Sequence, residues 1–189
     1  MLAAFVLGLI TATFEPVTPA TSAQPPEVFV RDPAAQPARG PGGHAWGLRP
    51  PLPGDSDALP LFNAKGDSVH TVLAIWRSAE GRVEIEPGAG GTRVRATFRG
   101  LVPLGRYSVF VRQLAGRSGP VFTPLDVTGA RDGFTADRLG RGELRLLTPM
   151  AIPSGAQLAL VYHSDGVDHR SSIGEPGITS HVQLITRVP

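Results

Sequence analysis

Two stretches of strict two-residue alternation constrain the fold of this chain more than any other feature. Arg82–Glu86 and Arg93–Arg99 alternate charged or polar and apolar side chains, and the intervening Pro87–Gly91 is rich in turn formers. Successive side chains of a strand point to opposite faces, so this pattern predicts a hairpin with one apolar and one charged face. A single register pairs opposite charges on one face and apolar side chains on the other. The predicted pairs are Glu86–Arg93, Glu84–Arg95, Ile85–Val94 and Val83–Ala96.

Further strand-like segments surround the hairpin at regular spacing. Each is short, contains β-branched or aromatic residues, and ends near a cluster of turn-forming residues. No stretch sustains the 3.6-residue period of an amphipathic helix. About eight or nine short strands with frequent turns are typical of an antiparallel Greek-key sandwich or barrel, so we predict an all-β domain over 58–189. The other expected strands are Val69–Trp76, Arg106–Arg112, Val121–Leu125, Gly133–Ala136, Glu143–Leu147, Gln157–His163 and Ser180–Arg187.

The N-terminal residues have the pattern of a secretory leader. The apolar run Met1–Phe14 is followed by small residues that end at Ala23. The run is shorter than the roughly 20 apolar residues that a membrane-spanning helix needs, and it suits the apolar region of a signal peptide. No Lys or Arg precedes the run, so a buried N-terminal helix or strand is the alternative. We predict a signal peptide over 1–23 and a secreted or periplasmic protein without a membrane span after its removal.

The next segment, 24–57, is rich in proline and shows no hydrophobic period. Proline fixes the backbone and removes hydrogen-bond donors, so we expect a flexible linker or tail here. Two short apolar islands interrupt it, Val28–Val30 and Trp46–Leu48. Either island could dock on the following domain or bind a groove of a partner.

Composition excludes several classes of protein. The chain has no Cys, which rules out disulfides, thiolate zinc sites, iron–sulfur clusters and a cysteine nucleophile. The formal net charge is only +2, and the arginines of the hairpin face carboxylates, so we expect no nucleic-acid partner. Lys65 is the only lysine, and this bias toward Arg indicates a GC-rich bacterial genome.

One string resembles a motif of known β-sandwiches. Leu101, Pro103 and Tyr107 have the Leu-x-Pro-x-x-x-Tyr spacing of the tyrosine corner in fibronectin type III and related domains. The resemblance implies that the Tyr107 hydroxyl hydrogen-bonds back over the corner. About 80 residues follow this tyrosine, which is more than a fibronectin module needs.

A second resemblance covers the chain loosely from Leu59 to His181. The order of strands and turns, with Ala136–Glu143 and Leu160–His163, resembles the Cu/Zn superoxide dismutase sandwich and CHRD-like secreted β-domains. That family carries a His-x-His pair where this chain has Val109 and Val111. The residues 115–131 contain no His, so only His163 matches a ligand position. The resemblance therefore implies a shared scaffold without dismutase activity.

The densest polar cluster follows the strand expected at Gln157–His163. Imidazole and carboxylate groups together suit Zn²⁺ or Cu²⁺, so a metal site is one hypothesis for this cluster. Ordinary turn chemistry is the alternative, because Ser164, Asp165 and Gly166 are typical turn residues. The candidate ligands are His163, Asp165, Asp168, His169 and His181.

We find no motif for nucleophilic, glycosidic or phosphoryl-transfer catalysis. We therefore predict a non-enzymatic exported module that acts by surface recognition, with an unknown protein or envelope partner and no cofactor. A Cu- or Zn-binding protein that uses the His163–His169 loop is the alternative. An exposed apolar patch would support recognition. Phe110, which points away from Tyr107, is the first candidate for such a patch, and cover by the N-terminal tail is the alternative for this residue.

Overall fold

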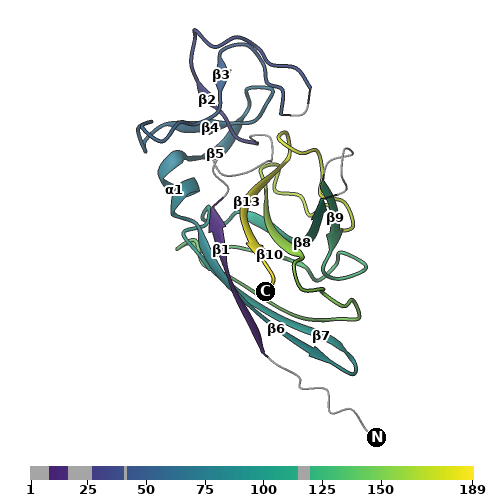
Figure 1. Ribbon diagram of the computed structural model, residues 1–189. Coiled ribbons are helices and arrows are strands. Elements are labelled where there is room, and N and C mark those ends of the chain that lie inside the picture. Colours follow the sequence, from purple (N-terminus) through teal and green to yellow (C-terminus); the bar gives the residue numbers. More distant parts are fainter. Residues whose placement is uncertain (1–8, 17–26, 41, 115–119) are drawn as a thin grey trace, which may run out of the picture.

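The protein is all-β, as predicted. A computed structural model describes residues 9–16, 27–40, 42–114 and 120–189 (Figure 1). Its main feature is one antiparallel sheet with the strand order β10-β8-β12-β13-β1-β6-β7-β11, and β9 pairs with β8 beside this path. The two ends of the order, β10 and β11, contact each other, so the sheet curls into a sandwich-like shape. The strands are β1 (Ile10–Pro16), β6 (Glu80–Gly88), β7 (Gly91–Arg99), β8 (Arg106–Leu114), β9 (Pro120–Pro124), β10 (Gly133–Thr135), β11 (Gly142–Thr148), β12 (Gln157–His163) and β13 (Ser180–Arg187).

The predicted hairpin is confirmed with its register. In β6 and β7, Glu86 lies opposite Arg93 and Ile85 lies opposite Val94, and the other two predicted pairs are present as well. Arg93 donates a hydrogen bond to Glu86 at 2.6 Å on the outer face. The strands extend to Gly88 and Gly91, so the turn is shorter than the loop expected from the sequence.

A row of aromatic rings crosses the main core. Phe14 from β1 lies 5.1 Å from Phe98, measured between ring centroids, and Phe98 stacks on Phe134 at 5.5 Å. Phe134 stacks in turn on Tyr107, which contacts Tyr162. These five rings come from five different strands. They fill the space that the curled sheet encloses, and the inward positions of the strands supply the rest of the core.

The expected tyrosine-corner hydrogen bond is present. The backbone N–H of Val102 donates to the hydroxyl oxygen of Tyr107 at 2.9 Å, across the corner that leads into β8. Tyr107 is fully buried. The corner thus fixes the start of β8 relative to the segment before it.

A smaller layer of short elements covers one end of the sheet, at the top of Figure 1. The sequence leads us to expect a flexible segment over 24–57, yet Phe29, Val30 and Leu48 are buried. Both apolar islands therefore contain residues that are docked on the rest of the fold, and the strands that contain Val30 and Leu48 pair with each other. The elements are β2 (Val30–Arg31), β3 (Leu48–Arg49), β4 (Pro60–Phe62), β5 (Ser68–Val72) and α1 (Leu73–Ser78).

The segment expected as a strand over Val69–Trp76 divides into β5 and α1. Leu73 and Trp76 lie three residues apart on one face of this short helix, and both are buried. A short apolar run fits a strand or a helix. Here the helical part packs Leu73 and Trp76 against the core. Within the described residues, no helix is long and apolar enough to cross a membrane.

Candidate functional site

The outer face of β8, β12 and β13 carries a second, smaller apolar cluster. Phe110 belongs to it, with Ala159, Val161 and Val182, and the ring of Phe122 from β9 packs edge-on against Phe110 at 6.2 Å. Phe110 points away from Tyr107 as expected, but it is 0% exposed. Of the two alternatives for Phe110, exposure does not hold, and β9 and the loop after β12 supply the cover that was expected from the N-terminal tail.

His163 extends this covered face with a polar group. It ends β12 and is 1% exposed, and its Nε2 lies 3.0 Å from the hydroxyl of Ser108 on β8. Its Nδ1 has no hydrogen-bond partner. Burial, together with the smaller effect of the neighbouring His169, lowers the pKa of His163 to about 4. The imidazole is therefore neutral at pH 7.

His169 and Asp165 lie next to His163. The rings of His163 and His169 are 5.3 Å apart between centroids. Nε2 of His169 lies 3.0 Å from a carboxylate oxygen of Asp165, which can only accept, so this nitrogen carries the proton. Asp168, the next candidate, forms an ion pair with Arg106. The guanidinium of Arg106 also lowers the pKa of His163, and the same positive charge disfavours a cation beside it.

His181, the remaining candidate ligand, faces other partners. Its Nδ1 donates to the backbone oxygen of Glu27 at 2.7 Å, and the hydroxyl of Ser164 lies 2.9 Å from its Nε2. Its ring also lies edge-on to Trp76. Burial lowers its pKa to about 4. Both ring nitrogens are thus occupied by hydrogen bonds within the protein.

The structure therefore brings four of the five predicted ligands into one loop region and gives the fifth a different role. Among the described residues, no group of three or more His, Cys, Asp or Glu side chains is placed to hold a metal ion. The metal hypothesis gains no geometric support.

Ser108 and His163 are within hydrogen-bond distance, as in serine hydrolases, but the arrangement differs in two ways. Ser108 is buried, so a substrate cannot reach its hydroxyl. No carboxylate orients Nδ1 of His163, which lacks a partner. A nucleophilic serine needs access and an oriented base, and this pair has neither.

Asp132 is the buried charge that the sequence did not reveal. It precedes β10, is fully buried, and no side chain donates a hydrogen bond to its carboxylate oxygens. Burial, together with the smaller effects of the charges of Asp168 and Asp126, raises its pKa to about 7. In the sequence it stands in a Gly-rich turn, where Asp is usually solvated, and no local pattern distinguishes it.

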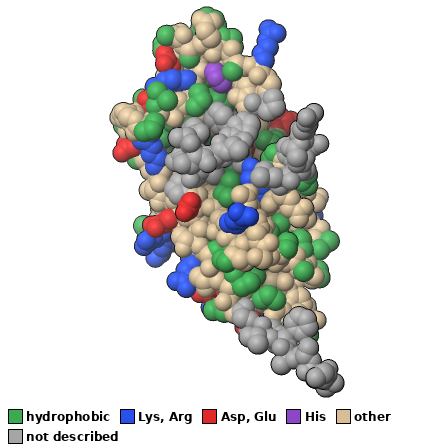
Figure 2. All heavy atoms as spheres, viewed as in Figure 1, with side chains coloured by type: hydrophobic (Ala, Val, Ile, Leu, Met, Phe, Trp, Pro, Cys, Tyr) green, Lys and Arg blue, Asp and Glu red, His purple; other side chains and the backbone are tan. Residues whose placement is uncertain are grey.

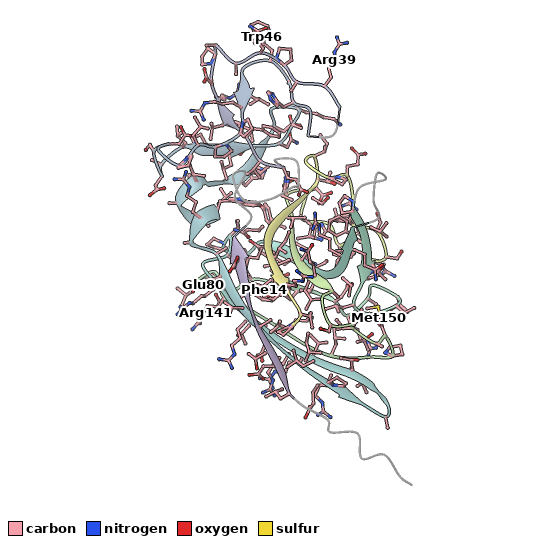
Figure 3. All side chains as sticks on the ribbon, viewed as in Figure 1. Phe14, Arg39, Trp46, Glu80, Arg141 and Met150 are labelled. Atoms are coloured by element: carbon pink, nitrogen blue, oxygen red, sulfur yellow. The ribbon has the colours of Figure 1, made fainter. Side chains whose placement is uncertain are left out.

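An open groove lies where β1, β6, β7 and β11 meet the turn after β10. Three arginines and three acidic residues line it, so opposite charges balance within it. Figure 3 shows Glu80 and Arg141 at this edge of the sheet, and Figure 2 shows red and blue side chains interspersed on the face drawn. Such a groove lacks the net positive charge that a polyanion requires. Its charged residues are Glu80, Arg82, Arg99, Asp137, Arg141 and Glu143.

The most exposed aromatic side chain of the described residues is Trp46, which is 61% exposed. It projects from the top of the small layer (Figure 3). The two neighbouring residues are held in place: Ala45 donates its backbone N–H to Ala64 at 2.8 Å, and Gly47 donates to Ala35 at 3.1 Å. Leu48, the next residue but one, is buried. The island that the sequence indicated thus divides into a docked leucine and a projecting indole.

Comparison of the sequence with protein-family models gives no match, and comparison with curated proteins gives none either.

Proposed function

We propose that this protein is an exported, non-enzymatic recognition module that binds a protein partner through Trp46. The observation that carries the proposal is a mostly exposed indole on a loop that the rest of the fold holds in place. Ser108 and His163 are both buried, which leaves that pair without access to a substrate, and we assign the activity to contact at the surface.

The loop is suited to binding because its conformation exists before the partner arrives. Asp32 donates its backbone N–H to the oxygen of Gly47 at 2.9 Å, which adds to the two bonds on either side of Trp46. Gly47 has a φ of +74°, a conformation that other residues adopt only with strain. A preformed loop loses little conformational entropy on association, so more of the contact energy contributes to affinity.

Tryptophan is also the side chain that most often dominates a protein interface. An indole buries on the order of 200 Å² when a partner covers it, which is worth about 3–5 kcal/mol of transfer free energy. Its N–H gives the contact a direction as well. Because charge is balanced in the groove of the sheet, we assign recognition to the loop and not to the groove.

Photocrosslinking in the producing cells tests this assignment. A benzophenone amino acid replaces Trp46 in one variant and Leu139, which is 73% exposed in the turn between β10 and β11, in a matched control. We expect a discrete protein adduct at position 46 and none at position 139. The partner identified in the adduct is then purified, and we expect Trp46→Ala to weaken its binding by about 30-fold or more and Trp46→Phe by less.

Two results would contradict the proposal. One is the same set of adducts at both positions, and the other is unchanged affinity in Trp46→Ala. A third measurement addresses membranes: vesicles of phosphatidylethanolamine and phosphatidylglycerol should leave the fluorescence emission of Trp46 unshifted. A blue shift on vesicles would replace the protein partner with a lipid surface.

A further inference from the structure

β1 occupies an unusual place in the sheet. It pairs antiparallel with β6 through Ile10–Phe14 and antiparallel with β13 through Glu15 and Pro16. In Figure 1 this strand, drawn in purple, runs between yellow β13 and teal β6. Among the described residues, β6 and β13 are linked only through β1 in the order of the sheet. β1 is thus the one strand that joins the two halves.

The slot that holds β1 has side-chain seats as well as backbone partners. Phe14 is 2% exposed and packs on Phe98, and Ala12 is also buried. Thr186 on β13 donates its hydroxyl hydrogen to the backbone oxygen of Thr13 at 2.6 Å. Thr13 itself is exposed, so apolar and polar positions alternate along the strand.

The same residues lie within 1–23, the segment that the sequence predicts to be removed on export. Cleavage after Ala23 would take away the whole of β1. The facing edges of β6 and β13 would then lose their backbone partners, and Phe98 would lose the ring that covers it. Unpaired strand edges next to exposed apolar surface are a template for another strand.

We infer that the processed protein uses the slot between β6 and β13 to bind an extended segment of a partner polypeptide, which takes the place of β1. This inference rests on the export that the proposed function includes. An added strand would pair with β6 along most of its length and with β13 at its end, as β1 does, and a small molecule or a sugar chain cannot repeat this pairing at the regular spacing of a sheet.

β1 itself defines the segment that fits. The strand must run antiparallel to both neighbours. It needs a large aromatic residue at the seat of Phe14 and a small residue at the seat of Ala12, which lies opposite Val83. The positions between these face solvent and accept polar residues. The predicted recognition pattern is therefore apolar, polar, small, polar, aromatic.

The test begins with the intact mass of the protein purified after export, which shows whether 1–23 is absent. A fluorescein-labelled peptide with the sequence of Leu9–Pro16 is then titrated with the processed protein. We expect micromolar or tighter binding. Phe14→Asp in the peptide should weaken binding by about 100-fold or more, because it removes the ring and places a charge in an apolar seat.

A substitution in the protein locates the peptide. Thr186→Val removes the hydroxyl that donates to Thr13 and should weaken binding by about 2- to 10-fold, the range for one hydrogen bond. Thr123→Val on β9 is the matched control, since this exposed residue lies on another strand, and it should change nothing.

The possible results separate the two proposals. A processed protein that does not bind the peptide, or binds the Phe14→Asp peptide equally well, overturns the strand-binding slot and leaves export intact. A purified protein that retains 1–23 contradicts processing on export, and it overturns the slot too, because β1 then fills it. A processed protein that binds only the original peptide supports both processing on export and the strand-binding slot.

Discussion

The hydroxyl of Tyr107 donates a hydrogen bond to Oε1 of Gln183, 3.0 Å away, and so connects β8 to β13 through the core. The hydroxyl oxygen of Tyr107 also accepts a hydrogen bond from the backbone N–H of Val102. Gln183 continues the network by donating from Nε2 to the backbone oxygen of Trp76 at 3.3 Å. One buried phenol thus ties the corner, the sheet and α1 together.

Replacing Tyr107 with Phe should lower the free energy of unfolding by about 2–3 kcal/mol, because it leaves a buried donor and a buried acceptor without a partner. Urea unfolding measures this difference. Tyr162→Phe is the control: it removes a single hydrogen bond to the oxygen of Val69 and should cost about 1 kcal/mol. Equal losses in the two variants would mean that the network at Tyr107 adds nothing beyond one bond.

Asp132 makes stability fall as pH rises. Its pKa in the folded protein, about 7, lies above the ordinary value of 3.8, so the folded state binds more protons between these two values. Above pH 7 the ionised, buried carboxylate costs up to about 4 kcal/mol. Asparagine does not titrate. The unfolding free energy of Asp132→Asn, relative to that of the original protein, should therefore increase between pH 4 and pH 8.

Asp126→Asn provides a control of opposite sign. Hydrogen bonds from Thr128 and Arg131 lower the pKa of Asp126, so its ionised form stabilises the folded state above the ordinary pKa. Losing it should therefore reduce stability at neutral pH. If both variants shift the pH profile in the same direction, the effect assigned to Asp132 is wrong.

His163 should make the protein sensitive to acid. Its pKa of about 4 lies below the ordinary 6.5, so the unfolded chain binds a proton that the folded protein does not bind between these values. Stability from this group is complete above pH 6.5 and is lost as pH falls to 4, by at most about 3 kcal/mol. In His163→Asn that loss should be absent, as measured by urea unfolding at pH 7 and pH 4.5. His70→Asn on the surface should keep the acid sensitivity.

Two glycines lie directly beneath aromatic rings. A Cβ at Gly142 would overlap the ring of Phe134, and one at Gly81 would overlap Phe98. Gly142→Ala and Gly81→Ala should each lower the melting temperature, because overpacking costs about 1–3 kcal/mol. Gly90→Ala in the hairpin turn meets nothing within 4 Å and should leave the melting temperature unchanged. A similar drop in all three would point to a general loss of backbone freedom in place of ring contact.

Much of the sheet was predictable because its information is local. Alternation and charge pairing placed β6 against β7 in the observed register, and β12 and β13 have the predicted bounds. β1 also alternates over Ile10–Glu15, but that pattern is continuous with an apolar run that suits a leader. A strand and the end of a leader can show the same alternation, and only the pairing of these residues with β6 and β13 shows that a strand forms.

The site was less predictable because burial of polar groups is not local. Sequence spacing placed His163, His169 and Asp165 together correctly, yet it could not show that His181 turns toward Glu27. The orientation of Phe110 followed from the period of β8. Its cover came from β9 and a distant loop, which no periodicity encodes.

The neighbours of β8 bear on the order in which the fold can assemble during synthesis. β6 and β7 find each other across a two-residue turn, whereas β8 pairs with β12 only after Gln157–His163 has left the ribosome. Local pairings close faster than distant ones. The hairpin therefore has time to form first, and Phe110 on the outer face of β8 keeps an uncovered side until the loop after β12, with Ile173, has been synthesised.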